Sequence, residues 1–111
     1  MSEHQSDTSS NVLRHVVLFA FKESSTAGQI REIERAFGEL PGKIDEVREF
    51  EWGTDVSVEN LSRGYTHCFL VTFLSEADRD TYLPHPAHQE FVAIVEPHLE
   101  KALVFDYWSR K

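Results

Sequence analysis

Three short segments of this chain are apolar on both faces of an extended strand, and this pattern constrains the fold more than any other feature. They run from Leu13 to Phe21, from Thr66 to Phe73 and from Ala102 to Trp108. A strand of this kind must be covered on both of its faces. Residues 47–52 instead alternate between apolar and polar side chains, which is typical of an edge or partly exposed strand.

Helical segments separate these strands. A capping box that begins at Thr26 opens an amphipathic helix, and this helix stops at Pro41. A second capping box, at Ser75, opens a short helix that must end before Pro84. Pro86 begins a further helix. The order of elements predicts an α+β domain with a ferredoxin-like βαββαβ fold and a four-stranded antiparallel sheet.

The helices of such a domain cover only one face of the sheet, so the second apolar face needs another cover. That face carries Val16, Leu18, Leu70, Leu103 and Phe105. The simplest cover is a second copy of the chain, packed sheet to sheet. We therefore predict a homodimer, a dimeric α/β barrel. The alternative is a monomer with an exposed apolar face, which proteins in water rarely keep.

The charge of the chain argues against two classes of partner. Its formal net charge is −8 and it has no basic stripe, so we expect it to bind neither nucleic acid nor an anionic membrane surface. Its single cysteine, Cys68, excludes an intrachain disulfide and favours a reducing compartment. Residues 1–11 lack the apolar stretch of a signal peptide. We expect a disordered leader over residues 1–11, one domain over residues 12–111 and a cytoplasmic protein.

Two histidines and one aspartate stand within predicted strands, where apolar side chains belong. His15 and His67 each share a strand face with aromatic or aliphatic residues, and Asp106 shares one with Val104. A lone strand histidine is more often a core residue whose two nitrogens are hydrogen-bonded. A carboxylate in such a place is costly unless it is paired, and a histidine is a natural partner for it.

One pocket between the sheet and its helices would bring the polar residues together. We predict that it contains His15, His67, Asp106, Tyr82 and His88, with Asp106 orienting the imidazole of His88. The apolar walls are expected from Val17, Phe19, Ile33, Phe37, Phe69, Phe91 and Val104. Such a pocket suits a small apolar or aromatic ligand that carries a few polar groups.

Three kinds of chemistry compete for these residues. A metal site needs three or four ligands from different elements, and the spacing of His85 and His88 does not supply them. A nucleophilic mechanism lacks a credible Ser or Cys. General acid–base catalysis by His88 and Tyr82 fits the residue types and needs neither a metal nor a cofactor. We expect this third chemistry, with Asp106 as a further catalytic residue.

Four motifs resemble the stress-responsive A/B barrel domain family, and the resemblance covers residues 13 to 111. They are Arg14-His-Val-Val-Leu-Phe-Ala-Phe-Lys22, Gly64-Tyr-Thr-His67, Tyr82-Leu-Pro-His-Pro-Ala-His88 and Val104-Phe-Asp-Tyr107. The resemblance implies homodimers that form through their sheets. It also implies roles, because the family includes plant polyketide cyclase activity, in which a Tyr and a His form the acid–base pair of an intramolecular aldol condensation. These two fall on Tyr82 and His88, with supporting polar residues at His15, His67 and Asp106.

The chain departs from the cyclase pattern at the pocket. Phe19 and Phe69 stand where smaller aliphatic residues are usual, and Leu99 replaces an aromatic residue. We therefore expect a pocket of different shape and a cofactor-independent, polyketide-cyclase-like or lyase-type enzyme that acts on another small carbonyl compound. Two alternatives stay open. One is a non-catalytic stress-response or small-ligand-binding dimer, and the other is an oxygenase of the wider dimeric barrel superfamily.

Overall fold

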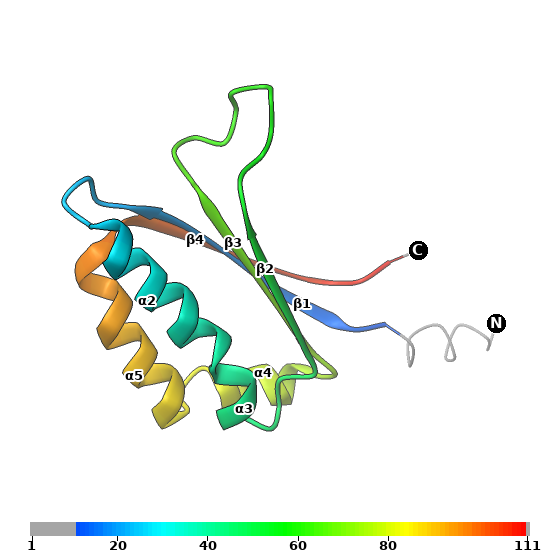
Figure 1. Cartoon of the computed structure of the whole chain (residues 1–111). Helices are drawn as coiled ribbons and strands as arrows, with labels where there is room; N and C mark the ends of the chain where they lie inside the picture. Colours follow the sequence, from blue (N-terminus) through cyan, green and yellow to red (C-terminus); the bar gives the residue numbers. More distant parts are fainter. Residues whose placement is uncertain (1–10, 111) are drawn as a thin grey trace.

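The computed structural model describes residues 11–110, and Figure 1 traces their path. The elements are, in chain order, β1 (Leu13–Phe21), α2 (Ala27–Gly38), α3 (Leu40–Lys43), β2 (Glu49–Thr54), β3 (His67–Phe73), α4 (Glu76–Tyr82), α5 (Pro86–Val95), the 3-10 turn η1 (Glu96–His98) and β4 (Leu99–Trp108). Most of the predicted leader, residues 1–10, lies outside the described part of the chain. No helix within residues 11–110 is long and apolar enough to cross a membrane.

The four strands form one antiparallel sheet in the order β2-β3-β1-β4, which confirms the predicted ferredoxin-like α+β fold. The strand β1 lies inside the sheet, between β3 and β4. Its register places His15 opposite Val71 on one side and opposite Asp106 on the other. The pairing of β1 with β4 thus brings together His15 and Asp106, which are 91 residues apart in the chain.

The largest differences from the predicted element boundaries occur at three places. The strand β4 begins at Leu99 rather than at Ala102, because η1 runs directly into it. The strand β2 is Glu49–Thr54, shifted from the predicted residues 47–52. Helix α2 ends at Gly38, and Pro41 lies in the first turn of the separate helix α3, where a missing N–H costs nothing.

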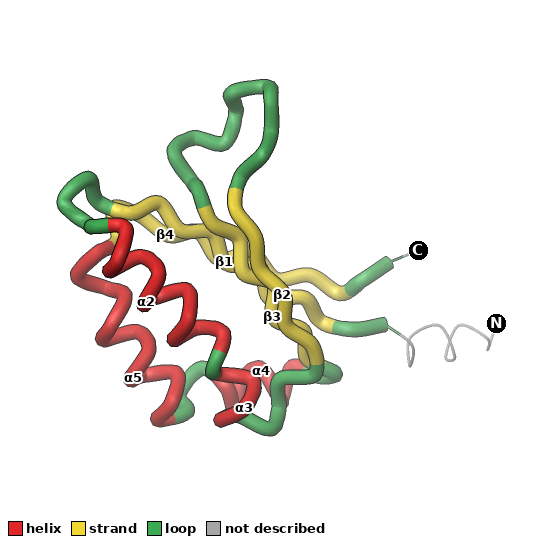
Figure 2. Tube along the Cα trace, in the orientation of Figure 1, coloured by secondary structure: helices red, strands yellow, loops and turns green. Residues whose placement is uncertain are grey.

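The helices lie on one face of the sheet and bury an aromatic core against it. Figure 2 shows α2 and α5 as neighbouring red tubes to the lower left of the sheet, with α3 and α4 at one end of the same layer. Phe19, Phe37, Phe69 and Phe91 are all buried between the layers. The rings of Phe37 and Phe69 are stacked with centroids 4.3 Å apart. These rings hold α2 against the middle of the sheet.

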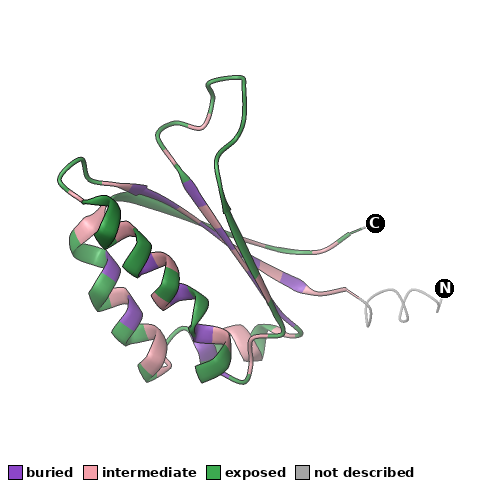
Figure 3. Ribbon diagram, in the orientation of Figure 1, coloured by how far each residue is buried: buried purple, intermediate pink, exposed green. Residues whose placement is uncertain are grey.

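No helix of residues 11–110 lies over the other face of the sheet, as predicted. The apolar side chains there are half-buried or exposed, and in Figure 3 most of β4 is drawn as exposed. The exposed fraction is 40% for Leu103 and 60% for Phe105. A shallow hollow of about 760 Å³ lies on this face and is lined partly by Val16, Leu18 and Leu70. The open apolar face is therefore a real feature of the single chain.

We expect the cap of α4 to stabilise the fold, because the Ser75 hydroxyl accepts a hydrogen bond from the Asp78 N–H at 3.1 Å. Ser75→Ala should lower the free energy of unfolding by about 1 kcal/mol, the usual effect of losing such a cap. Urea denaturation would show this as a lower midpoint at an unchanged slope. Ser75→Thr keeps the hydroxyl and is the matched control. Equal midpoints for all three proteins would contradict a capping role.

Candidate active site

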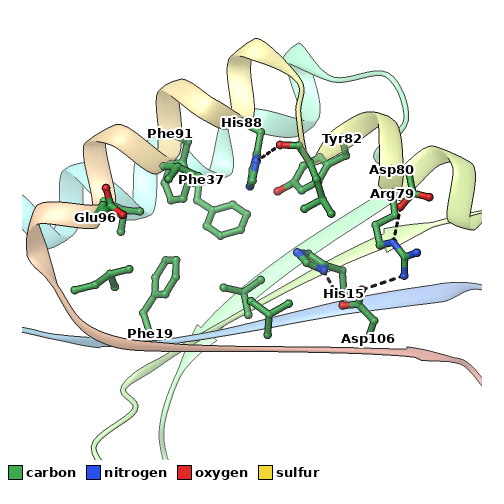
Figure 4. Close-up of a pocket in the computed structure, with 16 residues that line it drawn as sticks. His15, Phe19, Phe37, Arg79, Asp80, Tyr82, His88, Phe91, Glu96 and Asp106 are labelled. Carbon is green, nitrogen blue, oxygen red and sulfur yellow. Dashed lines mark hydrogen bonds and ion pairs between the residues drawn. The ribbon is translucent and has the colours of Figure 1, made fainter.

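A cavity of about 470 Å³ lies between the sheet and the helices α4 and α5. Figure 4 shows it from the side, with the strands below and the helices above. Its lining residues are His15, Val17, Phe19, Phe37, Arg79, Asp80, Tyr82, Leu83, His88, Phe91, Val92, Val95, Glu96, Leu99, Val104 and Asp106. The polar groups His15, Tyr82 and His88 face one end, and the aromatic residues Phe19, Phe37 and Phe91 face the other. The cavity therefore has a polar end and a mainly apolar end, where Glu96 also lies on the wall.

His88 projects from the first turns of α5 into the cavity (Figure 4). The helix starts here because His85 caps it, accepting the Ala87 N–H at 3.0 Å, and Pro86 follows the cap. The Nδ1 of His88 lies 2.8 Å from the carbonyl oxygen of Leu83. A carbonyl can only accept, so Nδ1 carries the hydrogen and Nε2 of the neutral ring is left as an acceptor. The predicted orientation of His88 by Asp106 is wrong, because the Leu83 carbonyl takes that place.

Tyr82 stands beside His88, at the end of α4. Its side chain is buried, and its hydroxyl has no hydrogen-bond partner within residues 11–110. The ring centroids of Tyr82 and His88 are 4.6 Å apart, and that of His15 lies 5.9 Å from Tyr82 on another side. Burial raises the pKa of the Tyr82 hydroxyl, so it stays protonated near neutral pH. A buried, unpaired donor of this kind is costly and is ready to bond to a ligand.

Asp106 reaches His15 rather than His88. The Nδ1 of His15 lies 2.8 Å from one carboxylate oxygen of Asp106, in agreement with the register of β1 and β4. The other carboxylate oxygen accepts a hydrogen bond from Arg79 Nη1 at 3.3 Å. Arg79 in turn donates from Nε to Asp80 at 3.1 Å. The carboxylate therefore joins a strand histidine to a helix arginine at the polar end of the cavity.

His67 does not reach this cavity, which corrects the predicted pocket. In the antiparallel pairing of β1 with β3, His67 lies opposite Phe19, at the other end of β3 from the partner of His15. Its Nε2 lies 2.7 Å from a carboxylate oxygen of Glu34 on α2, and its Nδ1 lies 2.8 Å from the Thr66 hydroxyl. His67 is thus a strand histidine with both nitrogens hydrogen-bonded.

The predicted apolar walls are partly right. Val17, Phe19, Phe37, Phe91 and Val104 line the cavity. Ile33 and Phe69 do not line it, because both are buried in the core behind the wall.

Two polar contacts of the site, those made by Arg79 and by the Leu83 carbonyl, were not predicted from the sequence. Arg79 stands one helical turn before Tyr82, so the spacing of α4 already places both on one face. That spacing was the available signal. The Leu83 carbonyl had no such signal, because the identity of a residue does not reveal where its backbone oxygen points.

The described residues offer little for a metal or for a thiol nucleophile. Within residues 11–110, no three His, Cys, Asp or Glu side chains gather closely enough to hold a metal ion. Cys68 lines the hollow on the open face of the sheet rather than the cavity. Burial, and to a smaller degree the charge of Glu51, raises the pKa of the Cys68 thiol, which disfavours the reactive thiolate.

We expect His88 to be neutral throughout the physiological range. Burial lowers its pKa below the ordinary 6.5, and the charges of His15 and His85 lower it further. The hydrogen bond to Leu83 raises the pKa but does not cancel these effects. The unfolded chain takes up a proton at the ordinary value, so the contribution of His88 to stability is full above about pH 6.5 and is lost as the pH falls below it. An NMR titration should give a midpoint below 6.5. A midpoint above 6.5 would contradict this account of the site.

The fold and the cavity define a class of protein, namely a ferredoxin-like α+β domain with a histidine- and tyrosine-lined apolar cavity. The chain belongs to the family of the Stress responsive A/B Barrel Domain, whose sequence model matches residues 13–109. It is 42% identical over 95 residues to the stress-response A/B barrel domain-containing protein HS1 of Arabidopsis thaliana, covering 86% of this chain and 87% of that one. It is 35% identical over 99 residues to olivetolic acid cyclase of Cannabis sativa, covering 89% and 98% of the two chains.

Solved structures show the same relationship in three dimensions. The hydroxynitrile lyase of Passiflora edulis superposes with a TM-score of 0.85 at 32% identity, covering 90% of this chain and 94% of the lyase. A dimeric ferredoxin-like protein from Jannaschia sp. CCS1 superposes with a TM-score of 0.76 at 26% identity, covering 86% and 97% of the two chains. The relatives of this chain thus include a cyclase, a lyase and a dimeric protein.

Proposed function

We propose that this protein is a cofactor-independent enzyme of the cyclase or lyase type, in which His88 and Tyr82 act as base and acid on a small carbonyl compound. The observation that carries the proposal is the pair of groups at the polar end of the cavity. Because Nδ1 of His88 donates to the Leu83 carbonyl, Nε2 is left as the acceptor. The neighbouring Tyr82 hydroxyl is a buried donor without a partner within residues 11–110. A base and an acid therefore face one ligand site.

In the first step His88 removes a proton from a carbon atom of the ligand. Nε2 of His88 takes a proton from the carbon next to the ligand carbonyl, and the electrons of that C–H bond move into an enolate. The enolate oxygen accepts a hydrogen bond from the Tyr82 hydroxyl, which holds the developing charge in a site of low polarity. Because the pKa of His88 is lowered by burial, the ring is unprotonated when the ligand arrives.

A cyclase and a lyase would use this base differently. In a cyclase, the enolate carbon attacks a second carbonyl carbon of the same molecule, and the proton on His88 passes to the new alkoxide. In a lyase, His88 instead takes the hydroxyl proton of a carbinol, the carbon–carbon bond beside it breaks as the carbonyl forms, and the departing carbanion takes that same proton back from His88. Olivetolic acid cyclase and the Passiflora lyase are relatives whose names describe these two outcomes.

The apolar end of the cavity supports an aromatic or alkyl group on the ligand. Phe19, Phe37 and Phe91 are buried aromatic residues on its wall, and Val104 and Leu99 add aliphatic surface. Aromatic rings pack on such a wall in stacked or edge-on arrangements. We therefore place the carbonyl of the ligand at Tyr82 and His88, and its ring or chain between α5 and the sheet.

Two probes test the enzyme. They are acetophenone, whose methyl protons would exchange in D2O, and mandelonitrile, which would be cleaved to benzaldehyde. Proton NMR and absorbance should show catalysis of at least one reaction. His88→Ala and Tyr82→Phe should lower its rate by about 10²–10⁴-fold, the usual cost of losing a positioned acid or base. Tyr82→Phe should leave the fold at least as stable, because it removes an unpaired buried hydroxyl.

The matched control is His98→Gln, which removes an imidazole that does not line the cavity. It should leave the rate unchanged. If wild-type protein binds both probes and transforms neither, the enzymatic proposal is wrong. The protein would then be a ligand-binding dimer, the reading favoured by its likeness to an A/B barrel protein whose name states a stress response and no reaction.

We also propose that the chain forms a homodimer through the open face of its sheet. The apolar side chains of this face have no cover within residues 11–110, and a relative of the same fold is dimeric. Burying such a face contributes about 25 cal/mol for each Å² removed from water. Sedimentation at micromolar concentration should therefore show one species of twice the chain mass.

The variant Leu18→Glu should break this dimer or unfold the chain, because it puts a charge in the middle of the apolar face. Glu32→Lys changes an exposed residue of α2 and should leave the dimer intact. A stable monomer of the wild-type protein would contradict the proposed interface.

A further inference from the structure

We propose that His15, paired with Asp106, is a second acid–base group of the cavity and exchanges a proton with the oxygen of the ligand, while His88 serves its carbon. This inference rests on the proposed function, since it adds a group to the same site. It also reassigns Asp106, which the structure places on His15 and not on His88.

The geometry of His15 is that of an imidazole prepared for proton transfer. Its side chain is buried on β1, and its Nδ1 lies 2.8 Å from a carboxylate oxygen of Asp106. The carboxylate only accepts, so Nδ1 carries the hydrogen. Nε2 has no hydrogen-bond partner within residues 11–110, and His15 lines the cavity. The ring rises from the sheet toward Tyr82 and His88 (Figure 4).

The two histidines differ in what holds their Nδ1 hydrogens. His88 donates to a neutral carbonyl, which favours a positive ring less than a carboxylate does. His15 donates to a carboxylate, which stabilises the imidazolium that forms when Nε2 takes up a proton. When two such groups share a site, their environments separate their roles. A positive charge in this cavity is therefore best accommodated on His15.

Every charged or titratable neighbour of His15 fits this assignment. Arg79 contacts the far oxygen of Asp106, while its own charge is shared with Asp80. Tyr82 is a neutral donor that can share its hydrogen with the ligand oxygen. A positive charge on His15 repels one on His88 and adds to the larger effect of burial in lowering the pKa of His88. The remaining ring neighbour, Phe73, is apolar.

His15 in its imidazolium form gives its Nε2 proton to the carbonyl oxygen while His88 takes a proton from the neighbouring carbon, so a neutral enol forms in place of a free enolate. In the reverse direction the hydroxyl proton moves to Nε2 of His15. No oxidant, metal or further reactant enters either step.

The probe for this step is 4-nitrophenol, whose anion absorbs visible light. Its ring suits the aromatic wall, and its hydroxyl takes the position of the ligand oxygen. Binding at a pH below the pKa of the free phenol should transfer the hydroxyl proton to Nε2 of His15 and produce bound phenolate. His15→Gln and Asp106→Asn should each lower the bound phenolate-to-phenol ratio by about tenfold or more, which corresponds to one pKa unit. His88→Gln should leave the ratio unchanged.

Two further variants complete the design. Glu100→Gln removes one negative charge from an exposed site on β4 and is the control for Asp106→Asn. The double variant His15→Gln with Asp106→Asn should lose no more than His15→Gln alone, because Asp106 acts through His15. Additive losses would show that Asp106 acts elsewhere and would overturn the pairing.

The wild-type protein provides a measurement that does not depend on any variant folding. With 15N-labelled histidine and bound 4-nitrophenol, His15 should show both ring nitrogens protonated and His88 only Nδ1. A protonated His88 with neutral His15, or loss of phenolate in His88→Gln alone, would overturn the inference and leave the simpler His88–Tyr82 proposal standing. Absence of bound phenolate in the wild type would overturn it too. None of these measurements uses turnover, so failure of the proposed reaction is read separately.

Discussion

The site depends on the antiparallel pairing of β1 with β4. This pairing sets His15 opposite Asp106 and adds β4 to the part of the sheet that lines the cavity. A slip of one residue in register would turn every side chain of β4 to the other face, which would remove both Val104 and Asp106 from the cavity. The apolar alternation of β4 specifies the register, since Leu103 and Phe105 pair with Leu18 and Val16 of the open face and Val104 lines the cavity. The polar chemistry therefore rests on a pattern of apolar residues.

The helices add the remaining groups by simple local rules. Ser75 begins α4 and His85 begins α5, and both act through side-chain caps on backbone N–H groups. The short connection between the two helices places Tyr82 and His88 next to each other and turns the Leu83 carbonyl back to His88. A packing role alone would not explain why the buried Tyr82 hydroxyl lacks a partner within residues 11–110. A ligand oxygen at this point would supply that partner.

Much of this arrangement could be predicted from the sequence. Strands apolar on both faces predicted the sheet and its open face, and the capping residues predicted where the helices begin. The location of His15, Tyr82, His88 and Asp106 in one cavity also followed from alternation and helical spacing. The hydrogen bonds that pair these residues could not be predicted. Whether Asp106 reaches His15 or His88, and whether His67 reaches the cavity at all, depends on the strand register and on distances of a few ångströms, which periodicity does not determine.

The long separation of His15 and Asp106 along the chain has a consequence for folding. Contacts between segments so distant in the chain are entropically costly to form, because the loop that joins them must lose conformational freedom. A partly folded chain with β4 undocked would lack the part of the cavity wall that Leu99 and Val104 form and would have no carboxylate for His15. A ligand of this cavity would then bind only the finished fold and would stabilise it by mass action. Such a ligand would therefore distinguish fully folded molecules from partly folded ones.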